Sequence, residues 1–545
     1  MHALRIIAFL LTFTLLGCSH ARSDASEALR KRAERKLMQR YDEPGAAAAY
    51  YEMKHAGAED RFAKYEAARA QIALRTQLKS TQTRPLAWRH LGPGNIGGRT
   101  RTLVIDPIDN DIMYTGGVSG GVWKSWDGGQ RWKPVSDELA NIAINSMAMD
   151  PRDRNTIYVG TGEGYFREEV RGTGLPLRGN GMFVTRDGGA TWTHIASTIN
   201  SDFHWVNDLT ISRHDPQRIY AATRTGVWRT SDAGGSWSNV VPVTAKGGCL
   251  DLAVREDASA DYLFASCGTL EQATVYRATN AETDAEWSVV LREPNMGRTS
   301  LAIAPSRPST IYALSASNQS GNFNQGLLAV FRSDSNGDEG SWRRTVRNTD
   351  AVKLNTLLLT NPLAALNREC ANADDFYVTM GWYCNVIAVD PVDHERVWAA
   401  GVDLFRSDDG GARWGVASYW WARGDEPSFA HADHHAIVFH PRYDGTANQT
   451  MYSANDGGIF RTGNARSPAA TGDRAGCSPN RSSVRFASLS NDLGVTQFYN
   501  GAVFPSGSRF IAGAQDNGTV AGELIEGTNG WRHLFGGDGG YVAVA

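Results

Sequence analysis

Short apolar runs with alternating polar positions recur through most of the chain, separated by turns rich in Gly, Asp and Pro. In the first copy of this unit, an apolar run at 103–105 ends in Asp-Pro, and a second run at 112–114 ends in Tyr. A hairpin at 121–132 follows and ends in Trp. Apolar and polar residues that alternate over such short stretches are typical of half-buried β-strands, so the pattern predicts an all-β chain.

The hairpin carries the most specific part of the repeat, Ser/Thr-x-Asp-x-Gly-x-x-Trp. Near-complete copies end at Trp132, Trp192, Trp237 and Trp414, and weaker copies end at Trp287 and Trp342. Copies about 45 to 70 residues apart fit four-stranded propeller blades better than helical repeats. The Asp side chain of each copy can accept turn N–H groups, the Gly supplies a positive φ and the Trp covers the hairpin. We therefore interpret the repeated carboxylates as turn residues and not as catalytic ones: Asp127, Asp187, Asp232 and Asp409.

This motif is the Asp-box, and over about residues 88–545 the chain resembles the Asp-box (BNR) β-propeller superfamily, in particular bacterial secreted xyloglucanase-like and sortilin-like proteins. The resemblance implies a propeller of about seven blades at 85–495, preceded by a short helical segment. Residues 496–545 are predicted to form one further blade, whose last strand-like run stops before its Asp-Pro. Because an unclosed blade exposes backbone groups, we interpret it as the start of a second propeller in a longer chain; one larger propeller is the alternative.

The N-terminus has the features of an export signal. Arg5 is followed by an apolar run that is too short for a membrane-spanning helix. Leu15-Leu-Gly-Cys18 resembles a bacterial lipobox, so we expect residues 1–18 to be a lipoprotein signal peptide and Cys18 to carry a lipid; an ordinary signal with a chance Cys is the alternative. Ser19 after this Cys implies, by resemblance, anchoring to the bacterial outer membrane, on its periplasmic or surface side. Residues 19–84 are rich in Ala, Glu, Arg and Lys and predict a helical spacer.

Export permits disulfides among the remaining cysteines. Cys249 and Cys267 begin and end two strand-like runs that form a hairpin, which places them opposite each other, so we predict a bridge between them. Cys370 and Cys384 bracket a long insertion and form the second predicted bridge. This pairing leaves Cys477 without a partner.

The blade topology sorts the polar loops onto two faces. Each blade has four strands, counted outward from the propeller axis, and consecutive antiparallel strands alternate in direction. The loop that enters the first strand and the loop from the second strand to the third therefore lie on the same face. The side chains that this rule brings together are Arg99, Glu163, Asp403, His431, Asp433, His434, His435, Asp456 and Asp516. Gly-rich loops at this end bring the backbone close to the axis, where a pocket mouth is expected. Trp420, Trp421 and an insertion at 161–181 are predicted to form walls there for a sugar or a peptide.

One hypothesis for this cluster is glycoside hydrolysis, which needs one protonated and one ionised carboxyl group across the bond. Asp456 is similar to the acidic loop residue of xyloglucanases, and Asp433 is its predicted partner, with Glu163, Asp403 and Asp516 as alternatives. One departure from those enzymes counts against this hypothesis. They carry a second Asp before the Gly-Gly of the first blade, where this chain has Gly117-Val-Ser-Gly-Gly121.

Two other hypotheses involve no hydrolysis. His431, Asp433 and His435 share one side of an extended segment and could ligate one Zn²⁺-like ion, but no further ligand completes the shell, so we expect no metal and no cofactor. The last hypothesis, which the missing Asp favours, is a cell-envelope lipoprotein propeller that binds a glycan or an extended peptide at its loop face. A net charge of −3 gives no reason to expect nucleic acid as a partner.

Overall fold

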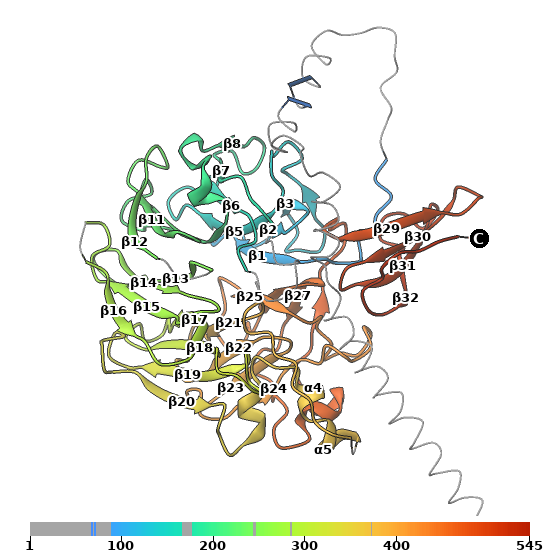
Figure 1. The fold of residues 1–545 in the computed structure, drawn as a ribbon. Coiled ribbons are helices and arrows are strands. Elements are labelled where there is room, and N and C mark those ends of the chain that lie inside the picture. The colour runs from blue at the N-terminus through green and yellow to red at the C-terminus, as the bar shows by residue number, and fades with distance from the viewer. Residues whose placement is uncertain are drawn as a thin grey trace, which may run out of the picture.

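The computed structural model describes residues 67–68, 70–71, 89–165, 177–243, 247–283, 286–371 and 373–544. In these ranges the chain folds into eight four-stranded antiparallel sheets (Figure 1). The predicted all-β architecture of propeller blades is therefore confirmed. The predicted signal peptide and the lipobox with Cys18 lie outside the described residues, and of the predicted helical spacer only 67–68 and 70–71 are described, all of them helical.

Each sheet is a meander of four strands that follow one another in the chain. The first two sheets contain β1 (Thr100–Ile105), β2 (Met113–Gly117), β3 (Gly121–Ser125), β4 (Lys133–Pro134), and β5 (Ile144–Met149), β6 (Ile157–Thr161), β7 (Met182–Thr185), β8 (Thr193–His194). The next two contain β9 (Val206–Ile211), β10 (Ile219–Thr223), β11 (Gly226–Thr230), β12 (Ser238–Pro242), and β13 (Cys249–Arg255), β14 (Tyr262–Cys267), β15 (Thr274–Ala278), β16 (Ser288–Leu291). The fifth and sixth contain β17 (Met296–Ile303), β18 (Ile311–Ser317), β19 (Leu327–Ser333), β20 (Arg343–Arg347), and β21 (Val386–Val389), β22 (Val397–Ala400), β23 (Leu404–Ser407), β24 (Gly415–Val416). The last two contain β25 (His434–Phe439), β26 (Met451–Asn455), β27 (Gly458–Thr462), β28 (Ala487–Ser488), and β29 (Phe498–Val503), β30 (Arg509–Ala514), β31 (Gly518–Glu523), β32 (Arg532–Phe535).

Among the described residues from 89 onward, helical structure is confined to short pieces in the connections. These are η1 (Ala196–Thr198), η2 (Ser201–Phe203), η3 (Lys353–Leu357), α4 (Pro362–Ala365), α5 (Asn367–Ala371), η4 (Ala475–Cys477) and η5 (Pro479–Arg481). Asn361 caps α4 by accepting a hydrogen bond from the backbone N–H of Ala364, and Pro362 occupies the first turn, where its missing N–H costs nothing. No helix in the described ranges is both long and apolar enough to cross a membrane.

Seven of the sheets form a closed ring. Their innermost strands, β1, β5, β9, β13, β17, β21 and β25, each contact the next, and β25 contacts β1. The hydrophobic core is divided into clusters between neighbouring blades, because each blade buries both of its faces. In one cluster Tyr114 of the first blade packs with Ile157 and Phe183 of the second.

The ring closes without a covalent link between the first and seventh blades. The indole Nε1 of Trp132 donates to the carbonyl of Leu489 at 2.8 Å, and Leu103 shares a core cluster with Tyr452. The two backbones also approach closely on the loop face, where a Cβ on Gly97 would lie 1.7 Å from the carbonyl oxygen of Gly457. Only glycine permits this approach, so the Gly-Gly sequences of both loops are needed for closure.

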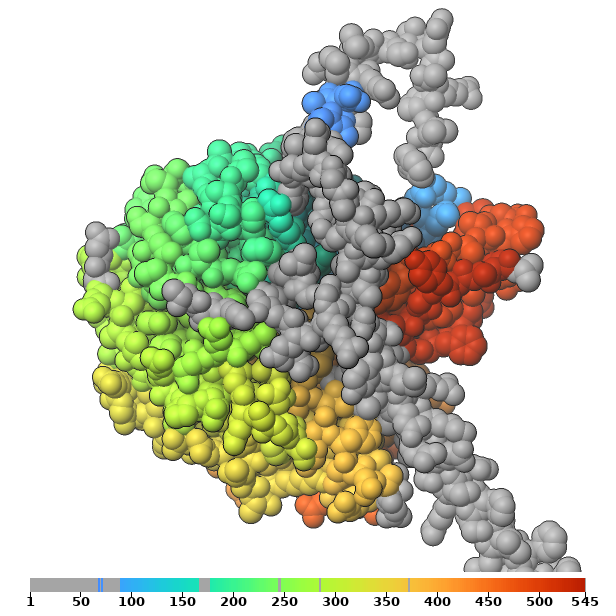
Figure 2. Space-filling view, viewed as in Figure 1, coloured from blue at the N-terminus to red at the C-terminus, as the bar shows by residue number. Residues whose placement is uncertain are grey.

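The eighth sheet, β29 to β32, lies outside the ring and projects from one side of it (Figures 1 and 2). Trp531 fixes it to the segment that enters β1: the indole Nε1 donates to the carbonyl of Leu91 at 2.8 Å, and the side chain packs on Ile96. The Asn95 side chain donates to the Trp531 carbonyl at 2.8 Å. The sheet therefore lies at the seam between the first and seventh blades.

The Asp-box side chains have the predicted turn role. Ser125 donates to Asp127 at 2.9 Å, and the same carboxylate oxygen accepts the backbone N–H of Arg131 at 2.9 Å. Gly128, with a φ of 68°, makes the turn between them. The same carboxylate-to-backbone bond recurs at the other boxes, from Asp187, Asp232 and Asp409.

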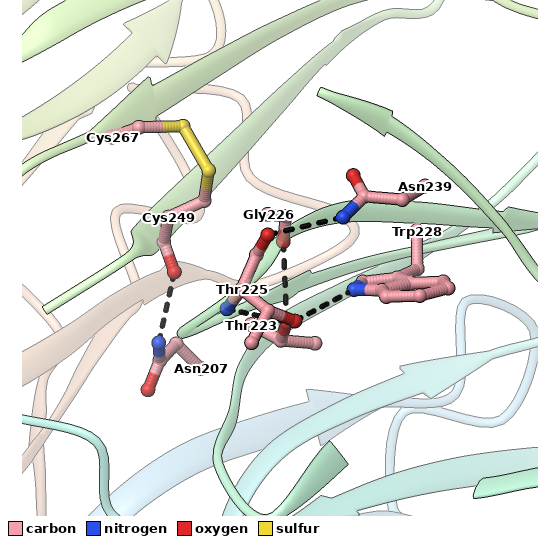
Figure 3. The surroundings of a disulfide bond; sticks show 8 residues. All are labelled: Asn207, Thr223, Thr225, Gly226, Trp228, Asn239, Cys249 and Cys267. Carbon is pink, nitrogen blue, oxygen red and sulfur yellow. Dashed lines mark hydrogen bonds between the residues drawn. A yellow bond between two sulfur atoms is a disulfide. The ribbon is translucent and has the colours of Figure 1, made fainter. Parts of the chain in front are cut away.

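One predicted disulfide is confirmed and the other is wrong. Cys249 and Cys267 are bridged across β13 and β14 (Figure 3). Cys370, however, pairs with Cys477, because α5 packs against η4, and the buried Cys384 takes part in neither bridge. The sequence did not show that the insertion between β27 and β28 would dock on the helix that precedes β21. Two disulfides indicate an extracytoplasmic, oxidising environment.

Candidate functional site

The innermost strands carry a β-bulge near their starts, and the bulge directs a side chain toward the ring axis. The strand register shifts there in six of the seven blades. The bulged residues are Arg101, Asn145, Asn207, Leu250, Arg298 and His435. A bulge re-aims a side chain and interrupts the ladder, so six blades deliver different chemistry to one place.

These side chains surround a central cavity of about 220 Å³, to which all seven innermost strands contribute residues. Besides the bulged residues, its walls include the carboxyl groups of Asp208 and Asp251 and the ring of Tyr165. Asn385, just before β21, supplies a side chain from the sixth blade, whose innermost strand has no bulge. The channel is therefore a polar cavity rather than a packed core.

Arg99 connects three carboxyl groups at the mouth of this channel. Its Nη1 donates to Glu163 Oε2 at 2.9 Å, its Nε lies 3.5 Å from Asp456 Oδ1, and its Nη2 lies 3.8 Å from Asp516 Oδ2. Arg101 also binds Glu163, through Nε at 3.0 Å and through Nη2. Burial opposes ionisation of Glu163, but the two guanidinium groups lower its pKa below the usual value. Glu163 is thus an ionised, doubly paired carboxylate.

Asp456 is surrounded by donors. The Tyr383 hydroxyl donates to its Oδ2 at 2.7 Å, and His435 Nε2 lies 2.6 Å from its Oδ1. The direction of the second bond follows from Arg101, whose Nη1 lies 2.7 Å from His435 Nδ1. A guanidinium can only donate, so Nδ1 accepts and Nε2 carries the proton that it donates to Asp456. Burial, and then Arg101 and Arg99, lower the pKa of His435 well below its usual value, so the ring is neutral.

Asp516, in the turn between β30 and β31, differs from these groups because its side chain is 27% exposed. Burial of the carboxyl group, and then the charges of Asp456 and Asp538, raise its pKa well above the usual value. The charge of Asp433 also raises the pKa of Asp516. Asp433 is itself partly exposed, and its φ of 67° lies in the left-handed region. The eighth sheet therefore brings a carboxyl group with a raised pKa to the mouth of the propeller.

The predicted histidine set does not converge on one point. His431 Nε2 donates to the carbonyl of Asp516 at 3.0 Å, His434 Nδ1 lies 2.6 Å from Ser453 Oγ, and His435 binds Asp456. In the part of the chain that the structure describes, no three His, Cys, Asp or Glu side chains are placed to hold a metal ion. These three histidines instead take part in hydrogen bonds that connect the loops and strands around the mouth.

The aromatic wall predicted from Trp420 and Trp421 is not formed. Both indoles are buried, at 3% and 7% exposure, in a core cluster with Tyr419. Asp403 accepts the backbone N–H of Trp420 at 2.8 Å and the hydroxyl of Ser418 at 2.9 Å, so it braces this loop away from the mouth cluster. The expectation of an exposed wall is wrong, because the loop packs against the insertion that precedes β21 and against Ala475, whose carbonyl accepts the Tyr419 hydroxyl at 2.9 Å.

Part of this chain is similar in sequence to known xyloglucanases. No family model matches the chain. A Paenibacillus xyloglucanase is 30% identical over 171 residues, which cover 28% of this chain and 16% of that enzyme. The xyloglucanase Xgh74A of Acetivibrio thermocellus is 27% identical over 169 residues, or 29% of this chain and 19% of the enzyme. The chain is a distant relative of the xyloglucanase-like, BNR-type β-propellers.

The fold of this xyloglucanase-like propeller is also found in solved structures. The xyloglucanase of Xanthomonas campestris has a TM-score of 0.55 at 18% identity, over 79% of this chain and 60% of that one. The GH74 enzyme of Niastella koreensis has a TM-score of 0.52 at 15% identity, over 78% of this chain and 59% of that one. This chain thus spans less than two thirds of these relatives. Identities this low establish the shared fold alone.

Sequence reasoning placed Arg99, Glu163, Asp456 and Asp516 on one face of the xyloglucanase-like propeller, and the structure brings them together. It did not include among its site residues the channel residues Arg101, Tyr165, Asp208, Asp251 and Arg298, or Tyr383, whose ring lies against Arg101. A signal for some of them was present. Four charged residues lie inside otherwise half-apolar innermost strands: Arg101, Asp208, Asp251 and Arg298. Charged side chains are rare in such buried strands unless they have a partner or a function.

Proposed function

We propose that this protein is an exported glycoside hydrolase that acts on a polysaccharide of the xyloglucan class where the propeller mouth meets the eighth sheet. The observation that carries the proposal is the partly exposed carboxyl group of Asp516, held beside three other carboxyl groups, Asp433, Asp456 and Asp538. A glycosidase needs one carboxyl group that keeps its proton near another that has lost it. The xyloglucanase relatives support the substrate class.

In this proposal Asp516 is the general acid. It donates its proton to the glycosidic oxygen as the bond to the anomeric carbon breaks. Asp433, partly exposed in the same place, is the ionised partner that takes a proton from the water attacking that carbon. Asp456 is a positioning residue, because its side chain is only 2% exposed and accepts bonds from His435 and Tyr383. After burial, its charge is the largest contribution that raises the pKa of Asp516.

The test is release of reducing ends from xyloglucan and other β-glucans by the purified protein. We expect Asp516→Asn and Asp433→Asn each to lower turnover by about a hundredfold or more while the glycan is still retained. Asp425→Asn, at an exposed carboxylate that pairs with Arg423, is the control and should leave turnover unchanged. Turnover that survives in both mouth variants would remove these residues from the reaction.

A second candidate function is binding without turnover, of a glycan or an extended peptide. The saturation of Glu163 and Asp456 by arginine, tyrosine and histidine donors favours it, since neither carboxylate has spare capacity for chemistry. The same assay separates the two functions. Retention of a glycan or peptide on the immobilised protein, with no release from any polysaccharide, would support a receptor or scaffold.

We further propose that Cys18 is lipidated and anchors the protein to the outer membrane. The lipobox sequence and the two disulfides support export by this route. Incorporation of labelled palmitate by the full-length protein, and its loss in Cys18→Ser, is the expected result. A protein that remains unlabelled would contradict the anchor and leave the hydrolase proposal untouched.

A further inference from the structure

One of the two disulfides ties the insertion that precedes β21 to another blade. This insertion is the connection between β20 and β21, residues 348–385, and it contains η3, α4 and α5. Cys370 on α5 is bridged to Cys477 on η4, which lies between β27 and β28 of the seventh blade. The two short helices also pack against each other. The proposed reaction does not use this bridge.

Tyr383, near the end of the insertion, contacts the charged groups at the mouth. Its hydroxyl donates to Asp456 Oδ2 at 2.7 Å. Its ring centroid lies 4.7 Å from the guanidinium carbon of Arg101 and 5.3 Å from that of Arg99. The ring of His435 packs edge-on against it, with centroids 5.1 Å apart. The position of this one side chain therefore affects the arrangement of four groups at the mouth.

The backbone before Tyr383 is held by the outgoing part of the same insertion. The N–H of Tyr383 donates to the carbonyl of Met380 at 2.9 Å. The N–H of Met380 donates to the carbonyl of Leu359 at 3.0 Å, and the N–H of Asn361 donates to the carbonyl of Val378 at 2.8 Å. The returning segment 376–380 is thus fixed only as well as the outgoing segment beside it.

The returning segment is also bonded to α5, the helix that carries the bridge. The side chain of Asn367 donates to the carbonyl of Asp374 at 3.1 Å, and the backbone N–H of Arg368 donates to Asp375 Oδ1 at 2.8 Å. Energetic coupling between distant groups is carried by such chains of packed and bonded residues. A continuous path therefore leads from the disulfide through α5 and the returning segment to Tyr383.

The helices that carry the bridge are not held by their own backbone bonds. α5 has five residues and η4 has three. Helices this short are unstable without tertiary contacts. α4 is buried, whereas residues 368–370 of α5 are exposed or partly exposed. The bridge is therefore a main constraint on the outer end of the insertion.

The two disulfides differ in their exposure to solvent. Cys370 and Cys477 are partly exposed, whereas Cys249 and Cys267 are 0% and 2% exposed. The thiol of Cys384 is buried as well. Thiol–disulfide exchange requires a thiolate to reach a disulfide sulfur. A reductant in solution should therefore open the bridge of the insertion first.

We propose that the Cys370–Cys477 disulfide regulates the mouth site, a role that rests on the hydrolase function proposed above. The bridge holds the insertion where Tyr383 orients Asp456. A dithiol opens it: one thiolate attacks a cysteine sulfur, and the second thiol resolves the mixed disulfide. The two electrons and two protons of the dithiol pass to Cys370 and Cys477, which become thiols, and the dithiol becomes a cyclic disulfide. Tyr383 is then held less firmly, and turnover falls.

The experiment compares the full-length protein before and after mild reduction with dithiothreitol. Alkylation of thiols followed by mass spectrometry identifies the opened bridges, and we expect labelling of Cys370 and Cys477 while Cys249 and Cys267 stay bridged. Turnover of xyloglucan should then fall on the order of tenfold with little change in KM, because a positioning contact is loosened. It should return on reoxidation. Cys384→Ser should show the same response.

Two variants test the path from the bridge to the mouth. Cys370→Ser combined with Cys477→Ser should have the turnover of the reduced protein and should not respond to dithiothreitol. Tyr383→Phe keeps the ring and removes the hydroxyl, so its turnover should be lower and should change less on reduction. If the double variant fails to fold, reversible reduction of the folded, unaltered protein still decides the question. An equal fold-change on reduction with and without the Tyr383 hydroxyl would overturn this path.

Hydrogen exchange separates this regulation from the hydrolase function. Reduction should increase exchange at the amides of Asn361 and Met380, which join the two segments of the insertion, and should leave the amides of β14 unchanged. If xyloglucan is not turned over in either redox state, the hydrolase function fails, and exchange alone decides whether the bridge controls the insertion. Unchanged exchange at these amides after the bridge has opened would overturn the proposal.

Discussion

Arg101 on the first blade and Glu163 on the second form an ion pair that is buried on both sides, with side-chain exposures of 2% and 7%. Arg101 Nε donates to Glu163 at 3.0 Å, and its Nη2 binds the same carboxylate oxygen. Because Arg101 lies on the innermost strand of the first blade and Glu163 follows β6 of the second, the pair joins the two blades at the channel mouth. Water cannot replace either partner there.

Removal of one partner from the Arg101–Glu163 pair should destabilise the folded protein. We expect Arg101→Met to lower the free energy of unfolding by about 3 to 5 kcal/mol, since Glu163 is left buried and unpaired. Arg213→Met is the matched control, because its pair with Glu256 has side-chain exposures of 52% and 78% and should contribute less than about 1 kcal/mol. Urea unfolding measures both. Similar losses in the two variants would contradict the role given to the buried pair.

The stability of the protein should fall in mild acid. Burial lowers the pKa of His434 to about 3, below the value of about 6.5 expected in the unfolded chain. Because the folded-state pKa is the lower one, the unfolded chain binds a proton first as the pH falls. The contribution of neutral His434 to the free energy of unfolding is therefore complete above about pH 6.5 and is lost as the pH falls toward 3. His435 acts in the same direction. In His434→Gln, the unfolding free energy should depend less steeply on pH between 6.5 and 4, whereas His533→Gln, at an exposed position on β32, should keep the original slope.

The two disulfides should differ in their effect on stability. In a chain-entropy model, loss of the bridge between Cys370 and Cys477, 107 residues apart, costs about 4.7 kcal/mol, and loss of the bridge between Cys249 and Cys267, 18 residues apart, costs about 3 kcal/mol. Paired Ser variants compared by urea unfolding test this order. Cys384→Ser is the control, since it leaves both bridges intact. A larger loss from the shorter loop would show that local strain, not chain entropy, dominates.

A methyl group at the seam should disturb ring closure. In Gly97→Ala the new Cβ would meet the Gly457 carbonyl oxygen at 1.7 Å, so two backbone segments must separate. Both are held by neighbouring blades, and we expect a loss of about 3 kcal/mol in unfolding free energy. Gly463→Ala, where no heavy atom lies within 4 Å of the new Cβ, should change stability by about 0.5 kcal/mol or less. Thermal and urea unfolding provide the comparison.

The proposed general acid predicts a specific pH profile. Turnover of xyloglucan should fall at alkaline pH as Asp516 loses its proton, and the fall should begin above the usual carboxyl range because its pKa is raised. Asp456→Asn removes one charge that raises this pKa, so the alkaline limb should move to lower pH in that variant. If the alkaline fall in turnover occurs at the same pH in Asp456→Asn, then Asp456 does not control the pKa of Asp516.

The sequence by itself determined those features that depend on near neighbours in the chain. Alternating apolar residues defined the strands, and the Asp-box turns, such as the one at Asp127, close within four residues. Cys249 and Cys267 could be paired because they lie on consecutive strands of one hairpin. The common face of Arg99, Glu163 and Asp456 followed from strand direction alone.

Only the tertiary structure decided which distant groups meet. Cys370 reaches Cys477 because two insertions dock on each other. Trp420 is buried because the insertion that precedes β21 covers it. The convergence of Arg298 and Asp251 in the channel depends on closure of a seven-blade ring and on bulges near the starts of its innermost strands. A bulge changes the direction of a side chain without a distinctive residue type, and ring closure joins strands that are hundreds of residues apart, so neither is encoded in a local pattern.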